Sequence, residues 1–178
     1  MLRRGYFHPA SMKMNLRWNA KMLSLLGGSP EFLEPSSITM PDRLELEATS
    51  GFKQVDGFVV QSSLDLKPTP TSSSSQAGET GASLFTEINV DRFLVEPIGI
   101  SELARLGLDF GFLLRKELTN SGIPGPFRII VRVRPANGES NVSESCTVRF
   151  QTVQGDQALF YNDNDLQSIE DAIAVLDF

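Results

Sequence analysis

The stretch FRIIVRVRP, residues 127–135, alternates apolar and basic side chains. Because successive side chains of a β-strand point to opposite faces of the sheet, this alternation predicts a half-buried strand. Its apolar face consists of Phe127, Ile129, Val131 and Val133. The opposite face consists of Arg128, Ile130, Arg132 and Arg134. The pattern thus predicts three arginines on the outward face of a sheet, in a chain whose formal net charge is −6.

The segment CTVRFQTV, residues 146–153, repeats the alternation after a polar loop. It has Cys146, Val148 and Phe150 on one face and Arg149 on the other. If the two segments pair as a hairpin, Arg149 lies on the same face as the first three arginines. The candidate binding surface therefore consists of Arg128, Arg132, Arg134 and Arg149.

Two interpretations of this surface stay open. Arginine side chains form paired hydrogen bonds with phosphate and carboxylate groups, so the surface suits an anion or an acidic partner. The other interpretation is ion pairing with Glu45 and Glu47, whose spacing would neutralise such a face from an adjacent strand. We favour the second, because the apolar Ile130 in the middle of the face indicates that it is partly covered.

Three further segments predict strands. The sequence DRLELEA, residues 42–48, alternates apolar with charged residues, including Glu45 and Glu47. Residues 52–67, FKQVDGFVVQSSLDLK, predict a hairpin around an Asp56-Gly57 turn. Residues 83–95, SLFTEINVDRFLV, predict another strand. These segments indicate an antiparallel sheet of about five strands.

Two segments have helical periodicity. Residues 101–118, SELARLGLDFGFLLRKEL, carry leucines at helical spacing after a capping Ser101. Gly107 and Gly111 in this segment predict close packing against another backbone. In residues 164–176, NDLQSIEDAIAVL, the apolar residues and the Asn164 cap predict a terminal helix. We therefore predict an α+β fold with two main helices packed on one face of the sheet, plus an N-terminal helical extension.

The charge distribution divides the chain. Residues 1–30 contain five basic residues and no acid, so the rest of the chain has a net charge of −11. We predict a basic N-terminal extension over residues 1–37, helical over residues 11–26, and a single α+β domain over residues 38–178. A Ser/Pro-rich excursion at residues 67–81 is expected to be disordered. A basic, acid-free leader is typical of organelle import signals, which is the alternative to a cytoplasmic location.

Composition excludes several classes of function. The chain has 178 residues, of which 40% are hydrophobic, and no apolar run long enough to cross a membrane. A single cysteine, Cys146, excludes an internal disulfide and favours a reducing compartment. The only histidine, His8, lies in the basic leader, which argues against imidazole catalysis in the domain. Asp163 and Asp165 resemble the start of a calcium loop whose later ligands are missing, so we expect no catalytic, cofactor or metal site.

We expect a non-catalytic protein-interaction module, such as an adaptor, a regulator or an inhibitor or immunity-like protein. Its acidic surface suits a basic protein partner through electrostatic attraction. One alternative is a nucleic-acid or phosphorylated-ligand binder that uses the arginine surface. Another is a hydrolase that depends on carboxylates such as Glu45 and Glu47. The sequence suggests no membrane partner and assigns no oligomeric state.

Overall fold

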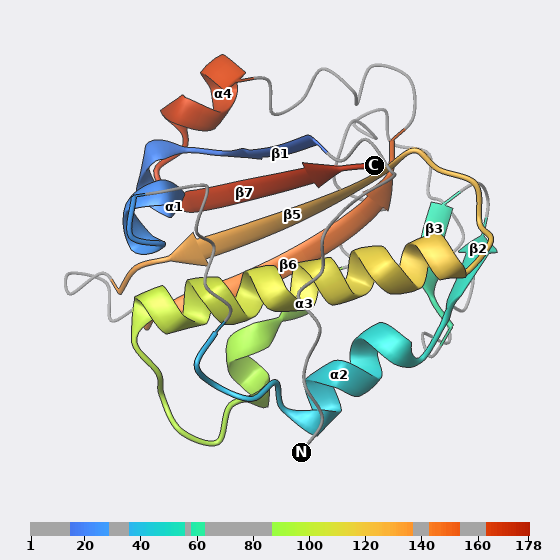
Figure 1. Ribbon diagram of the computed structural model, residues 1–178, viewed down its shortest axis with the longest axis horizontal. Helices are drawn as coiled ribbons and strands as arrows, with labels where there is room; N and C mark the ends of the chain where they lie inside the picture. Colours follow the sequence, from blue (N-terminus) through green and yellow to red (C-terminus); the bar gives the residue numbers. More distant parts are fainter. Residues whose placement is uncertain (1–14, 29–35, 56–57, 63–86, 137–142, 154–162) are drawn as a thin grey trace, which may run out of the picture.

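The computed structural model describes residues 15–28, 36–55, 58–62, 87–136, 143–153 and 163–178 (Figure 1). In chain order the elements are β1 (Asn15–Trp18), α1 (Ala20–Leu25), α2 (Asp42–Thr49), β2 (Phe52–Val55), β3 (Phe58–Gln61), β4 (Glu87–Asn89), the 3₁₀ helix η3 (Val90–Phe93), α3 (Ile100–Asn120), β5 (Phe127–Arg134), β6 (Ser145–Thr152), α4 (Asp163–Ser168) and β7 (Ala172–Asp177). No helix among these residues is long and apolar enough to cross a bilayer.

The main sheet has the strand order β1-β7-β5-β6-β4, and every neighbouring pair is antiparallel. Strand β5, which carries the alternating apolar and basic residues, lies in the middle between β7 and β6. Its Ile129 is in register with Phe150 of β6 and Leu176 of β7. The predicted α+β fold with a five-stranded antiparallel sheet is therefore confirmed. Strands β2 and β3 form the predicted hairpin as a separate two-stranded sheet, although its turn at residues 56–57 lies outside the described residues.

Helix α3 crosses one face of the sheet and α2 lies beside it on the same side (Figure 1). The apolar faces of α3, β5, β6 and β7 meet in one core, in which Phe110, Ile129 and Phe150 are fully buried. The two glycines predicted to allow close packing do so. A Cβ atom added to Gly107 would lie 2.5 Å from Sγ of Cys146, and one added to Gly111 would lie 3.3 Å from a methyl carbon of Val131.

The terminal segment corrects the sequence prediction. Residues 163–168 form the short helix α4, and residues 172–177 are strand β7 rather than the second half of a helix. Strand β7 runs between β1 and β5, and one of its faces packs in the main core while the other packs against Leu166 of α4, so nearly all its side chains are buried. A strand buried on both faces has a continuous apolar sequence. Such a run also contains apolar residues at helical spacing, so its pattern does not distinguish a strand from a helix.

A small second cluster explains how the other face of β7 is covered. Its buried residues are Ile130, Leu166, Ile173 and Val175. Leu166 belongs to α4, so this helix packs on the face of the sheet opposite α3. The sequence prediction that both main helices share one face is therefore wrong for the terminal segment. Partial cover of the arginine face, inferred from Ile130, is confirmed.

Residues 42–49 form helix α2, not a strand. Leu44 and Ala48, four positions apart, are buried in the core beside α3, whereas Leu46 is 64% exposed. Seven alternating residues contain both a period of two and an i, i+4 pair, so the pattern did not distinguish the two structures. Glu45 and Glu47, two positions apart on a helix, point in different directions instead of sharing a strand face.

Among the described residues of the N-terminal segment the helix is α1, so the prediction of a helix over 11–26 is wrong for residues 15–18. These residues form β1, an edge strand paired with β7, and residues 1–14 lie outside the described ranges. The buried Asn19 joins the two elements. Its Oδ1 accepts hydrogen bonds from the backbone N–H groups of Met22 (3.0 Å) and Ile173 (3.1 Å), and its Nδ2 donates to the carbonyl oxygen of Asp171 (2.7 Å).

Of two further predictions, one is confirmed in part and one falls outside the described residues. The strand predicted within residues 83–95 is the three-residue edge strand β4, followed directly by η3. The excursion at residues 67–81 lies outside the described residues.

Candidate functional site

The four predicted arginines lie on the outward face of the sheet. Three of them alternate along β5, and Arg149 of β6 is in register with Ile130 between them. The sequence therefore predicted which face they occupy. Binding by this face stays a prediction. The four side chains differ in exposure and in the acids that they contact.

Arg128 is a structural residue. Only 4% of its side chain is exposed, and its Nε donates to Oδ1 of Asp177 at 2.6 Å. The same carboxylate accepts from Arg17 of β1 at 2.7 Å. These contacts connect the ends of β1, β5 and β7, and they leave little of Arg128 for a ligand to reach. On the same face, towards the β4 edge of the sheet, Arg149 pairs with Glu87 of β4 at 2.7 Å.

Arg132 and Arg134 are more open. Their side chains are 46% and 48% exposed, and both contact the carboxylate of Asp171, whose side chain is only 12% exposed. Arg132 forms an ion pair through its guanidinium group and donates a hydrogen bond from Nε, while Arg134 approaches the same oxygen to 3.6 Å. Two guanidinium groups thus share one negative charge.

The predicted partners of the arginines were wrong. Glu45 and Glu47 lie on α2, on the α3 side of the sheet, and the acids that pair with the arginines are Asp171, Asp177 and Glu87. Two of these acids flank or end β7, which the sequence pattern had assigned to a helix. The pairing of Asp171 and Asp177 with the arginines could not be predicted from the sequence, because it depends on β7 lying beside β5.

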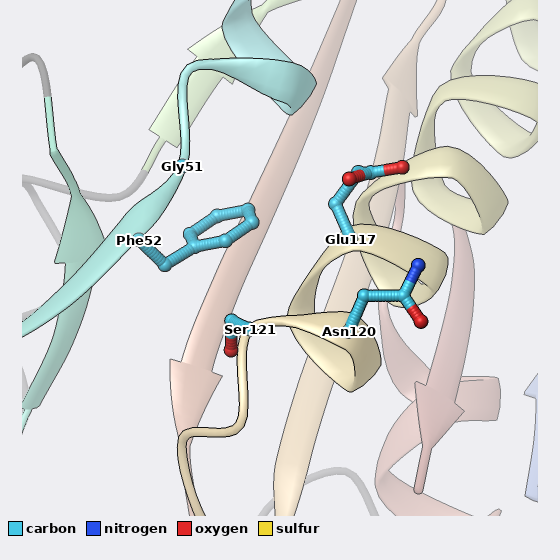
Figure 2. Close-up of a pocket in the computed structure, with 5 residues that line it drawn as sticks. All are labelled: Gly51, Phe52, Glu117, Asn120 and Ser121. Atoms are coloured by element: carbon cyan, nitrogen blue, oxygen red, sulfur yellow. The ribbon is translucent and has the colours of Figure 1, made fainter.

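A depression of about 240 Å³ lies at the C-terminal end of α3, and it is lined by Gly51, Phe52, Glu117, Asn120 and Ser121 (Figure 2). Phe52, at the start of β2, points towards the last turn of α3, near the side chain of Glu117 (Figure 2). One edge of this pocket is fixed by the core, because Phe52 packs edge-on against Phe150 with ring centroids 5.3 Å apart. No sequence motif had marked these residues.

The electrostatics of this pocket favour positive charge. Among the described residues of the last turn of α3 there is no base, and the acid Glu117 lies there instead. Both donors of the capping Ser121, its N–H and its hydroxyl, bond to the carbonyl oxygen of Leu118, at 3.2 and 2.7 Å. Lys116 approaches Glu117 only to 3.9 Å and is half exposed, so this ion pair is weak in water.

Two other titratable groups are shifted. Burial raises the pKa of the Cys146 thiol far above its ordinary value, and the nearby charge of Asp91 adds to this rise. A thiol held in its neutral form is a poor nucleophile. Partial burial acts to raise the pKa of Glu102, but hydrogen bonds from Ser37 and Ser36 and the charge of Arg105 outweigh it, and this pKa is lowered.

Within the ranges that the structure describes, no group of three or more histidine, cysteine, aspartate or glutamate side chains is arranged to hold a metal ion. Comparisons of the chain with protein-family models, with curated proteins and with solved structures found no match. A function for the chain must therefore be inferred from its own residues.

Proposed function

We propose that this chain is a non-catalytic protein-interaction module, an adaptor, regulator or inhibitor, that receives a basic side chain of a partner protein at the end of helix α3. The observation that carries the proposal is the carboxylate of Glu117 in a last helical turn that has no base among its described residues, beside the exposed part of Phe52.

The position of Glu117 is unfavourable for the isolated chain. The last carbonyl groups of a helix have no partners within the helix and carry about half a negative charge. A carboxylate added there is repelled, whereas a cation is stabilised by about 0.3–1 kcal/mol. Residues that oppose a local preference without compensation occur mainly at functional sites. The weak ion pair with Lys116 compensates the Glu117 carboxylate only in part, and a cation from a partner would add to it.

Phe52 supplies a second attraction. A lysine or arginine over an aromatic ring gains about 0.5–2 kcal/mol, depending on how far it is desolvated. An exposed ion pair with Glu117 adds about 0.2–1 kcal/mol. With the helix terminus, one basic side chain gains on the order of 1–4 kcal/mol, roughly a five- to 700-fold change in affinity. This is a contact within a larger interface rather than a complete binding site.

The neighbouring surface can extend the contact. Helix α2 leads through Ser50 directly to Gly51 at the rim of the pocket. On α2 the large side chain of Leu46 is 64% exposed, and Asp42, one helical turn before it, is also exposed. An exposed leucine beside acids suits a partner with both apolar and basic residues. The net charge of −6 would attract such a partner at long range.

The proposal is tested by titrating the full chain with N-acetyl-lysine amide while amide chemical shifts are recorded by NMR. We expect weak, saturable shifts at Gly51, Phe52 and Ser121 that decrease with added salt. The neutral analogue N-acetyl-norleucine amide should cause none. Glu117→Gln should abolish the saturation, whereas Glu45→Gln, which removes the same charge from the exposed face of α2, should leave it within about twofold.

The outcomes are distinguishable. Shifts that the neutral analogue causes equally would show an apolar contact without charge recognition. Equal losses in Glu117→Gln and Glu45→Gln would assign the effect to net charge, and either result would remove the basis of the proposal.

A further inference from the structure

We infer that Arg132 and Arg134 form a second site, on the opposite side of the sheet, that binds the phosphate group of a small phosphorylated ligand. This site is independent of the proposed pocket at the end of α3, because it uses the outward face of β5 and β6.

The sheet register places hydroxyl groups beside the two arginines. Arg132 lies opposite Thr147, and Arg134 lies opposite Ser145. Side chains directly opposite each other on antiparallel strands point to the same face, with Cβ atoms about 4.5–5.5 Å apart. Thr147 and Ser145 are both half-buried. The two arginines and the two hydroxyl residues therefore lie beside one another on one face of the sheet, and phosphate oxygens accept hydrogen bonds from both kinds of donor.

The charge of this patch is not balanced. Arg132 and Arg134 share the single carboxylate of Asp171, which leaves one positive charge among these three residues. Arg149 on the same face is matched one to one by Glu87. Arg17 and Arg128 also share one carboxylate, but their side chains are only 19% and 4% exposed. Arg132 and Arg134 thus combine excess positive charge with open access, whereas the other pair has little access.

The arginines are held in place before any ligand arrives. The backbone carbonyl of Asp171 accepts a hydrogen bond of 2.7 Å from Asn19, a residue that is 2% exposed and also bonded to β7. Asp171 is therefore fixed at the start of β7, and its carboxylate positions the guanidinium of Arg132. A ligand that meets ordered side chains loses less free energy in ordering them.

The size of the patch indicates one phosphate group. Arginine forks suit phosphate oxygens, and two guanidinium groups with two hydroxyls supply donors for a single group. A nucleic-acid surface would need a row of accessible cations that follows the backbone. Along β5 the next arginine, Arg128, is buried.

The experiment is a calorimetric or NMR titration of the full chain with inorganic phosphate and with phenyl phosphate, at ionic strength held constant with sodium chloride. We expect saturable binding of both. Arg134→Gln, an exposed residue with a long contact to Asp171, should weaken binding at least tenfold, and Arg132→Gln should do the same. Arg149→Gln is the matched control on the same face and should change affinity less than twofold. Circular dichroism checks that each variant is folded.

Absence of saturable binding would overturn the inference, and so would an equal loss in Arg149→Gln. A second titration uses single-stranded DNA of five and fifteen nucleotides. A site for one phosphate predicts similar affinities per binding site for both lengths. A steep increase with length that depends on Arg149 would overturn the single-phosphate site in favour of an extended nucleic-acid surface. Failure of this site would leave the pocket at Glu117 untouched, because the two use different residues.

Discussion

Replacement of Gly107 by alanine tests the close contact between α3 and the sheet. The new Cβ would lie 2.5 Å from Sγ of Cys146 and 3.1 Å from a methyl carbon of Val131, and both of these side chains are fully buried. Relief requires that α3 move away from the sheet or that β5 and β6 shift. Overpacking of this kind costs about 1–3 kcal/mol, and a contact this short belongs at the upper end.

Alanine also has a favourable effect, because it is better than glycine in a helix interior by about 1 kcal/mol. The expected net loss for Gly107→Ala is therefore about 1–2 kcal/mol of unfolding free energy, or roughly 2–8 °C in melting temperature for a chain of this size. Gly111→Ala is the matched control. Its nearest contacts would be 3.3 and 3.5 Å, so the helix preference should nearly cancel the crowding and keep stability within about 1 kcal/mol of the parent.

The assay is urea unfolding followed by circular dichroism, with the double variant Gly107→Ala/Cys146→Ala as a rescue. Removal of Sγ leaves a small void in the parent but makes space in the Gly107→Ala variant. We therefore expect a favourable coupling of about 1–2 kcal/mol in the double-mutant cycle. The reasoning is refuted if Gly107→Ala is as stable as the parent, or if Cys146→Ala destabilises both backgrounds equally.

Three further predictions concern buried and titrating groups. Asn19→Ala should lower the unfolding free energy by about 2–4 kcal/mol in urea titrations, because it leaves buried groups such as the N–H of Ile173 without a partner. Asn19→Asp keeps this acceptor but places a buried carboxylate oxygen against the carbonyl oxygen of Asp171, so it should also be destabilising. Cys146 should react with iodoacetamide only as fast as the chain unfolds, since burial raises the pKa of its thiol; rapid alkylation without urea would contradict this. Partial burial acts to raise the pKa of Glu102, but hydrogen bonds such as that from Ser37 outweigh it and the pKa is lowered. The ionised Glu102 therefore stabilises the folded chain fully above pH 4.5, and this stabilisation disappears as the pH falls through the lower pKa of the folded state. Acid titrations of stability should therefore be flatter for Glu102→Gln below pH 4.5 than for the parent.

The long elements were predictable from local pattern. Strand β5 alternates along its length except at Ile130, and α3 carries an apolar stripe over 21 residues. Patterns of this length fit only one period, so the element type and the core face of each followed directly. The outward direction of Arg132, Arg134 and Arg149 also followed, because it depends only on strand alternation.

The short elements were not predictable in the same way. Residues 42–49 satisfy the periods of both a strand and a helix, and their packing against α3 selects the helix. Residues 172–177 are apolar at nearly every position because strands cover both edges of β7, while the core and α4 cover its faces. In both cases neighbours that are distant in sequence decide between two locally acceptable structures.

Local sequence patterns were sufficient to predict the α+β class, the central hairpin of β5 and β6, the long helix α3 and the face on which the arginines lie. Tertiary packing was needed to show that Arg128 is buried, that Arg132 and Arg134 stay open on one shared carboxylate, and that Glu117 and Phe52 line one pocket at the end of α3. The physical reason is that backbone geometry sets the direction of a side chain locally. Exposure and ion pairing depend on which distant segment packs beside it.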